Sequence, residues 1–369
     1  MKERALDHKC PGCGAPIVFD PKSGKWKCDH CNMEYDLETL KKFNNASSDA
    51  NNTKEEIKEE EKAEGKEVKS SDGDVSYIEY HCKDCGAKII ADENTASTFC
   101  VYCGNTAILK SKLSGKFAPS KIIPFSKTKE DAVAAFKELH KGRPLMPRFF
   151  NDEKNIEKIS GVYIPFWLFG FKTQGKIDVK ATKVKTWVVG DTSYTQTDTY
   201  SVQREAELTY NRIPVDGSTR FDDDIMNTIE PYDYSKFVDY NHAYLSGFLA
   251  EKYDVESDTA IIDAKKRADT TSKTVLLDSV KGYTTKTITS SEFNNEVTKQ
   301  EYVLLPVWMV NIKFNDKFYT FAMNAQTGEF VGNIPVDKKR AVLYGLGILI
   351  VVIAIVVLIG FIAYSMRGA

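Results

Sequence analysis

The pattern of hydrophobic and polar positions is most pronounced at the C-terminal end of the chain. From Val342 to Tyr364 the sequence carries no charge over 23 residues. A helix of about 20 apolar residues crosses the hydrocarbon core of a bilayer. We therefore predict a transmembrane helix over 342–364 rather than a buried core helix. Three basic residues at 338–340 precede the run and only Arg367 follows it, so the positive-inside rule predicts a single-pass anchor in the cell membrane with the N-terminal bulk cytoplasmic.

Helical periodicity recurs in three places between residues 113 and 337. The segment 128–142 has Thr128 as a candidate N-cap and Gly142 at its end. The segment 222–241 predicts one or two short helices interrupted near Pro231. A longer helix is predicted over 256–280, where apolar residues recur at helical spacing: Ile261, Ala264, Ala268, Val275 and Leu276.

The remaining apolar segments of this region predict strands. Residues 163–184 and 301–332 are rich in aromatic and β-branched side chains, and hairpin turns are predicted at 173–176, 314–317 and 325–329. The motif Ile-Pro-Phe-Trp at 164–167 is matched by Leu-Pro-Val-Trp at 305–308. This repeat predicts two related β units, and its prolines predict a sheet edge or a strand start at each site.

The segment 44–76 has almost no apolar residues and is dominated by Glu, Lys, Asn and Ser. Such a composition buries too little surface to order a chain, so we predict a disordered spacer. A flexible coil of this length spans roughly 30 Å root-mean-square. The module that precedes it is therefore expected to be tethered rather than packed.

All eight cysteines fall into two sets with identical spacing. Each set contains two Cys-x-x-Cys pairs separated by fourteen residues, and the second set follows the first by 72 residues: Cys10, Cys13, Cys28 and Cys31, then Cys82, Cys85, Cys100 and Cys103. Two such turns joined by a β-hairpin direct four thiolates at one ion. Strands are predicted at 15–19 and 25–28 around a turn at 20–24, and at 87–90 and 97–100 in the second copy.

This spacing predicts two zinc ribbons, each holding one structural Zn²⁺ through four cysteines. A rubredoxin-like iron site uses the same ligands and stays open as an alternative. No signal peptide precedes the first set, so the cysteines are expected in the cytosol, where thiolates stay reduced. Four sulfur ligands leave no open position, so we expect the metal to fold a module too small to build its own core.

Charge bears on what the ribbons bind. The chain has a net charge of −2, and four thiolates on one zinc ion add a formal −2 to each module. This balance makes nucleic acid an unlikely partner and favours protein contacts. The sequence lacks Gly-Lys-Ser/Thr, His-Glu-x-x-His and Gly-x-Ser-x-Gly motifs, so we expect no catalytic residues and infer no small-molecule substrate.

These features together resemble a known family. The paired ribbons, "YIPFWLF", "LLPVWMV", "FAMNAQTGEFVGNIPV" and the C-terminal apolar run are similar to bacterial YdjG-type membrane proteins. Such sequences are compared with the zinc ribbon of transcription factor IIB or labelled primosomal helicases. The resemblance implies a membrane adaptor linked to SPFH-domain and phage-shock-type envelope-stress proteins.

The expected fold class is therefore α+β multidomain. It comprises zinc ribbons at 1–43 and 77–112, the spacer at 44–76, a mixed α+β cytosolic domain with two related β units at 113–337, and a tail anchor at 338–369. The expected function is a non-enzymatic, membrane-anchored adaptor that presents protein-binding modules. The alternative is a membrane-tethered nucleic-acid-binding zinc-ribbon protein.

Overall fold

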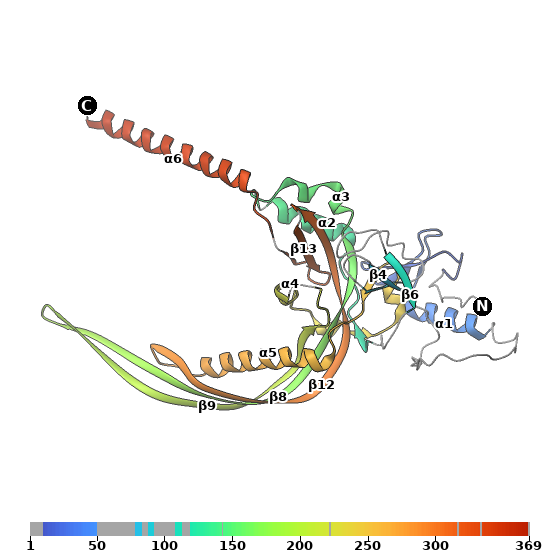
Figure 1. Ribbon diagram of the computed structural model, residues 1–369, viewed down its shortest axis with the longest axis horizontal. Coiled ribbons are helices and arrows are strands. Elements are labelled where there is room, and N and C mark those ends of the chain that lie inside the picture. Colours follow the sequence, from blue (N-terminus) through green and yellow to red (C-terminus); the bar gives the residue numbers. More distant parts are fainter. Residues whose placement is uncertain are drawn as a thin grey trace.

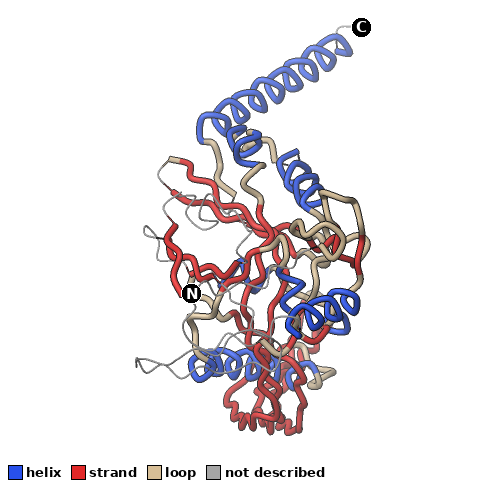
Figure 2. The backbone as a smooth tube through the Cα atoms, turned by 90° about the vertical axis from the view of Figure 1, so that its right-hand side faces the viewer, coloured by secondary structure: helices blue, strands red, loops and turns tan. Residues whose placement is uncertain are grey.

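The protein is a mixed α and β structure in which strands dominate (Figure 2). The computed structural model describes residues 10–49, 78–82, 88–91, 108–112, 119–141, 143–220, 223–315, 317–332 and 334–367. Its main strands are β1 (Val18–Asp20), β2 (Lys25–Lys27), β3 (Glu34–Tyr35), β4 (Ile78–Cys82), β5 (Lys88–Ala91), β6 (Ile108–Lys112), β7 (Lys121–Ile122), β8 (Ser160–Val189), β9 (Thr192–Asp216), β10 (Val238–Asp239), β11 (Leu249–Glu251), β12 (Thr285–Phe314), β13 (Lys317–Asn324) and β14 (Phe330–Gly332). The α-helices are α1 (Leu37–Asp49), α2 (Lys129–Lys141), α3 (Glu153–Ile156), α4 (Asp223–Thr228), α5 (Ser257–Asp278) and α6 (Lys338–Arg367).

The antiparallel pair β8–β12 is the centre of the large sheet. Its register runs from Met309 opposite Ser160 to Thr285 opposite Thr182. Residues 161–171 of β8 are buried on both faces, and residues 172–181 then alternate between buried and exposed. The near-continuous apolar run and the alternating run are therefore one strand whose surroundings change along its length.

The alternating section forms a curved three-stranded ribbon of β9, β8 and β12, with α5 along its concave side (Figure 1). The buried side chains of this section, among them Ile177 and Val179 of β8 and Val202 of β9, pack with Leu276 of α5. The predicted turn at 173–176 is wrong, because β8 continues through it. Gly175 serves close packing instead, since a Cβ atom there would lie 2.9 Å from the ring of Phe293.

The two strand prolines lie in the middle of the sheet, not at a sheet edge or a strand start as predicted. On the side of β8 away from β12, the partner changes from β11 at Tyr163 to β9 at Phe166, so Pro165 falls at the exchange. On the outer side of β12, the partner changes from β7 at 303–304 to β13 from Val307, so Pro306 falls at the equivalent exchange. A residue without an N–H group is tolerated at such a gap in the ladder.

The two prolines belong to a pseudo-two-fold repeat. The carbonyl of Pro165 accepts a hydrogen bond from the Gly217 amide, and that of Pro306 accepts one from the Ala325 amide. The indole of Trp167 donates to the Val255 carbonyl at 2.9 Å. The equivalent indole of Trp308 donates to the Lys127 carbonyl at 2.8 Å.

The repeat exchanges elements between its halves. Short strand β7 precedes α2, and short strand β11 precedes α5, yet β7 pairs in parallel with β12 and β11 pairs in parallel with β8. The short strand of each half therefore pairs with the long strand of the other half. This arrangement supports the prediction of two related β units. It also explains the equivalent places of the two tryptophans, each of which bonds its long strand to the start of the helix in the other half.

The predicted helices of this body are confirmed with small changes. Helix α2 begins after Thr128. The hydroxyl and the backbone amide of Thr128 both donate hydrogen bonds to the Asp131 carboxylate, and the Asp131 amide donates back to the hydroxyl, which makes a reciprocal cap. Helix α5 buries a strict i, i+4 stripe: Ala260, Ala264, Ala268, Ser272 and Leu276. Val275, one of the apolar residues on which the helix was predicted, lies outside this stripe and is exposed. Short α4 and a 3₁₀ turn at Tyr234–Lys236 flank Pro231.

The turns at 314–317 and 325–329 are confirmed, since they join β12 to β13 and β13 to β14. The predicted spacer begins later than expected, because α1 continues to Asp49. The rest of the spacer lies outside the described residues. Of the second cysteine module, β5 matches the strand predicted at 87–90 and pairs with β11, while the predicted strand at 97–100 lies outside the described residues.

Helix α6 leaves the body as a separate rod (Figure 1). Within its segment Lys338–Gly360, an 18-residue stretch has a mean hydropathy of 3.2 and is not buried against the protein. It is long and apolar enough to cross a membrane, and it is not a core helix of the body.

We expect Trp308→Phe to lower the free energy of unfolding by about 2 kcal/mol, because it removes a hydrogen bond and leaves a carbonyl without its indole partner. Trp167→Phe should cost a similar amount, since its bond is the equivalent one. Urea unfolding of the detergent-solubilised protein, followed by circular dichroism, would measure both.

Trp187→Phe is the matched control, because that side chain is 45% exposed. Its effect should stay within about 0.5 kcal/mol. Equal unfolding midpoints for Trp308→Phe and Trp187→Phe would show that the repeated indole bonds do not hold the two halves together.

Candidate metal centre

The first cysteine module folds as predicted into a small antiparallel sheet of β1, β2 and β3. Asp20 accepts hydrogen bonds from the amides of Lys22 and Ser23, and Gly24 adopts a positive φ of 67°, which closes the β1–β2 turn. Gly14 also has a positive φ, 73°, directly after the first Cys-x-x-Cys pair. A side chain would strain the backbone at either glycine.

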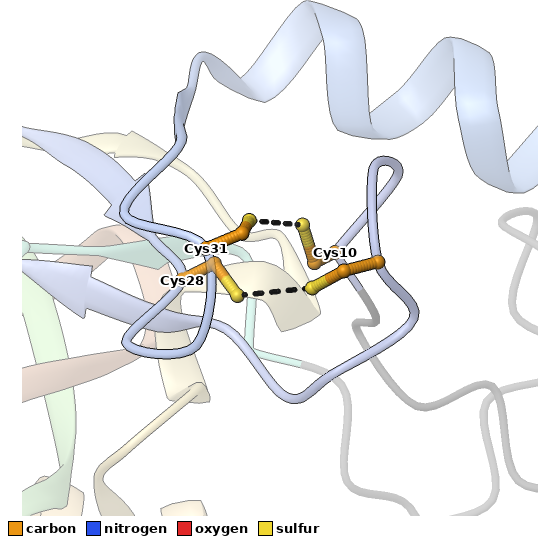
Figure 3. Close-up of side chains that lie close together, drawn as sticks. Cys10, Cys28 and Cys31 are labelled. Atoms are coloured by element: carbon orange, nitrogen blue, oxygen red, sulfur yellow. Dashed lines mark hydrogen bonds between the residues drawn. The ribbon is translucent and has the colours of Figure 1, made fainter.

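The hairpin brings the four cysteines of this module together (Figure 3). The sulfur atoms of Cys10 and Cys31 are 3.4 Å apart, and those of Cys13 and Cys28 are 3.5 Å apart. All four sulfur atoms lie within 4.8 Å of one another. Tetrahedral coordination at about 2.3 Å would separate the sulfurs by about 3.8 Å, so the cluster fits a four-coordinate metal ion.

Sequence reasoning missed one residue of this site. The hydroxyl of Tyr35 lies 3.2 Å from Cys10 Sγ, where it can donate a hydrogen bond to a thiolate. Burial raises the pKa of Cys10, but the hydrogen bonds from Tyr35 and from the backbone of Cys13 and Gly12 outweigh it, and the pKa falls to about 6. The site thus favours a thiolate before any metal charge is added.

The pKa of Cys31 indicates that neighbouring thiolates in this cluster repel one another. The pKa of Cys31 is raised to about 12: a hydrogen bond from the Met33 backbone lowers it, but burial and the neighbouring sulfurs outweigh that effect. A metal ion bound by the four sulfurs would remove this repulsion, since cysteine ligands are deprotonated when they bind a metal. The electrostatics therefore match the geometry.

The module does not swing on a tether, which corrects the prediction. The Trp26 indole donates to the Ala243 carbonyl of the body at 2.7 Å, and the Phe19 amide donates to the Ser246 carbonyl at 3.2 Å. Trp26 is 1% exposed. Its ring and that of Phe19 both contact Tyr244, with centroids 5.1 and 5.4 Å apart.

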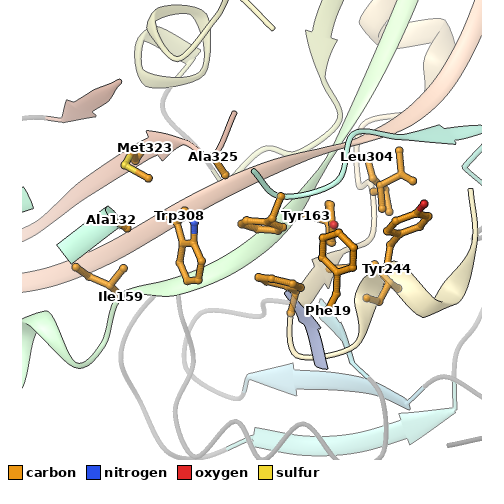
Figure 4. Packing of buried hydrophobic residues seen from close by; sticks show 14 of the residues in the cluster. Phe19, Ala132, Ile159, Tyr163, Tyr244, Leu304, Trp308, Met323 and Ala325 are labelled. Atoms are coloured by element: carbon orange, nitrogen blue, oxygen red, sulfur yellow. The ribbon is translucent and has the colours of Figure 1, made fainter. Parts of the chain in front are cut away.

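One hydrophobic cluster joins the module to the body. It includes Phe19, Trp26 and Leu40 on the ribbon side and Tyr244 and Phe248 on the body side. Figure 4 shows Phe19 of β1 among the side chains of the body, close to Tyr244. A module of this size cannot enclose a tryptophan alone, and the body supplies the missing wall.

A cavity of about 470 Å³ lies at this junction. It is lined by Phe19, Pro21, Gly24, Pro124, Phe125, Ser126, Asp233, Lys236, Tyr244, Gln326 and Thr327. The Asp233 carboxylate already accepts a hydrogen bond from the Ser235 amide. The lining is mostly apolar, and its polar side chains are those of Ser126, Asp233, Lys236, Gln326 and Thr327.

The second cysteine set is only partly described. Cys82 ends β4, which pairs with β5 and β6. Cys85, Cys100 and Cys103 lie outside the described residues, so the second metal site remains a prediction.

Fold and site together define a class: a mixed α/β protein with a four-cysteine candidate metal centre docked on its body and one apolar C-terminal helix able to span a membrane. The chain is 34% identical over 343 residues to "Uncharacterized protein YdjG" of Bacillus subtilis (strain 168), covering 93% of this chain and 94% of that protein. The chain therefore belongs to the YdjG family. No family model and no solved structure matches it.

We expect Tyr35→Phe to weaken metal binding about tenfold, because a hydrogen-bond donor to a ligand sulfur stabilises its thiolate. Competition with a chromophoric chelator would measure the change. Tyr194→Phe is the matched control, since it removes an exposed hydroxyl remote from the cysteines. Identical affinities of the two variants would remove Tyr35 from the site.

Chelation should release the first module from the body. Without its ion the module cannot hold its fold, so Trp26 should become exposed and its emission should shift to the red. The long strands should keep their far-ultraviolet circular dichroism, because their core lies in the body. Trp26→Phe should abolish the shift, and loss of the strand signal together with the module would contradict this separation.

Proposed function

We propose that this protein is a membrane-anchored zinc-ribbon adaptor. In this proposal both cysteine sets hold a structural Zn²⁺, α6 spans the cell membrane once, and the bulk of the protein lies at the cytoplasmic face. The protein performs no catalysis and recruits protein partners. SPFH-domain and phage-shock-type proteins are the expected partners, on the strength of the family resemblance described above.

The observation that carries the proposal is the closed cysteine cluster joined to the body. Four sulfur ligands leave no position for water or substrate, so a metal there acts on shape. Because Trp26 docks the first cysteine module on the body, the surface of the module becomes part of the surface of the body.

The first module also has an outward surface suited to protein contact. Met33 beside the second Cys-x-x-Cys pair is 53% exposed, and Phe43 on α1 is 37% exposed. These two side chains are available for contact with a protein partner that the module would bind. The acidic balance of the module disfavours phosphate binding and supports the adaptor over the nucleic-acid alternative.

Cross-linking in intact membranes tests the proposal. The native chain should capture SPFH-domain or phage-shock-type proteins, and the double variant Cys28→Ser/Cys31→Ser should lose them while staying in the membrane. Lys266→Gln, an exposed change on α5, is the matched control and should keep all partners. Metal analysis of the purified chain should find zinc rather than iron.

Two results would refute the proposal. Partners unchanged by the cysteine variant would mean that the ribbon does not recruit them. Nucleic acid captured through the ribbons, with affinity that falls steeply as salt rises, would instead favour the nucleic-acid-binding alternative.

A further inference from the structure

The far end of the β8–β9 hairpin is an exposed apolar surface. Six large hydrophobic residues in 184–200 are exposed: Val184, Trp187, Val188, Val189, Tyr194 and Tyr200. Outside α6, the described residues contain only nine others, scattered over the rest of the chain. Single exposed apolar residues are ordinary, but a cluster at the end of a projecting element marks a contact site.

The cluster lies at the part of the hairpin that extends beyond both β12 and α5. The last pair between β8 and β12 is Thr182 with Thr285, and beyond it β8 pairs only with β9, up to Val189 with Thr192. These seven residues extend the hairpin by roughly 23 Å at about 3.3 Å per residue. Helix α5 has ended by then, at Asp278.

Most of the six apolar residues lie on one face of the hairpin end, and Val184 and Val188 lie on the other. Strand alternation places Trp187 and Val189 on the same face as Ile177 and Val179, which α5 covers further back. Tyr194 is directly opposite Trp187, and their rings stack with centroids 5.9 Å apart. This Trp187 face therefore lies on the same side as the buried face of the ribbon, and Lys183 and Lys185 separate the two apolar parts on that side.

The opposite face of the hairpin end is mainly hydroxylated. Thr186 pairs with Thr195 there, and Val188 pairs with Ser193. At the turn, Gly190 and Asp191 join the strands. A carboxylate at the extreme tip disfavours end-on insertion into hydrocarbon, so contact through the Trp187 face is favoured over penetration by the turn.

The charge of the hairpin end is balanced, with Lys183 and Lys185 against Asp191 and Asp198. Lys183 is held against the rings of Tyr200 and Tyr283, at 5.5 and 5.3 Å from their centroids. Electrostatic attraction to a charged partner therefore contributes little. The surface offers a tryptophan and a tyrosine side by side, the two residues that favour the boundary between water and lipid.

The location of α6 indicates which surface the hairpin meets. Figure 1 shows α6 and the far end of the β8–β9 hairpin projecting to the same side of the body, beyond all other labelled elements. The hairpin end reaches about as far to that side as the C-terminal end of α6, so the hairpin lies at the surface of a bilayer that α6 crosses only when α6 is tilted in that bilayer. Helix α1 and the first cysteine module lie on the opposite side.

We propose that the Trp187 face of the β8–β9 hairpin rests in the interfacial layer of the bilayer that α6 spans, as a second contact with the membrane. The inference rests on the proposed anchoring by α6 and deepens it. A helix alone lets the body rotate and tilt above the membrane. A second contact at the end of a long arm sets the orientation in which the metal-held module faces the cytoplasm.

Trp187 permits a direct test in the full chain. Of the four tryptophans, Trp26, Trp167 and Trp308 are 1%, 8% and 6% exposed, while Trp187 is 45% exposed. The protein is reconstituted into nanodiscs of zwitterionic lipid, with or without bromine atoms near the top of the acyl chains. The fluorescence difference between the native chain and Trp187→Phe isolates the signal of Trp187.

We expect brominated lipid to quench the Trp187 signal about twofold or more, since bromine acts only on rings at its depth. High salt should leave the quenching unchanged, because the contact is apolar. The matched control is Phe43→Trp in the Trp187→Phe background, which moves the exposed tryptophan to α1; it should show no quenching.

Three outcomes would overturn the inference. Equal Trp187 fluorescence in ordinary and brominated lipid would show that the hairpin does not touch the bilayer. Protection of Trp187 from aqueous acrylamide without bromine quenching would show that protein, such as a second copy, covers it. Failure of the chain to enter nanodiscs would refute the anchoring by α6 and this contact with it, whereas the first two results leave the anchor intact.

Discussion

The antiparallel pairing of β8 with β12 is the constraint on which the rest of the structure depends. This pair places its neighbouring strands: β9 and β11 lie along the free side of β8, and β7 and β13 lie along the free side of β12. Pro165 and Pro306 fix where each neighbour must stop and the next can begin, because neither can donate to the ladder. The two indole bonds then hold the starts of α2 and α5 against the exchanged strands.

One sheet serves three environments along its length. Where helices and loops cover both faces, β8 is buried throughout; where α5 covers one face, burial alternates; beyond α5 the strands are bare. The same pairing thus builds a core at one end and an exposed arm at the other. An arm with a hydrophobic end must be explained by what it contacts, since exposed apolar surface is costly in water.

The cysteine module and the body depend on each other. The metal-binding geometry orders a hairpin that is too small for its own core, and the body encloses the tryptophan that the hairpin cannot bury alone. Loss of metal would then affect the surface of the body as well as the ribbon. A metal ion held by the four cysteines would therefore stabilise part of the surface of the body as well as the module itself.

Local pattern in the sequence was enough for the apolar helix, the helices α2 and α5, the turns after β12 and β13, and the gathering of Cys10, Cys13, Cys28 and Cys31. Each of these depends on periodicity or spacing within a few residues. The repeated Pro-x-Trp motif also indicated two related β units, because the same side chains recur in the same local order.

The tertiary structure decided the features that depend on distant partners. Gly175 suggested a turn. It lies instead within a continuous strand, where the ring of Phe293 packs so close that it leaves no room for a Cβ atom. The two prolines suggested edges, but the exchange of neighbouring strands allows them in mid-sheet. The low-complexity spacer suggested a free module, but Trp26 has a carbonyl partner 217 residues away. Sequence patterns report local preference, whereas these outcomes depend on which surfaces meet after the chain has folded.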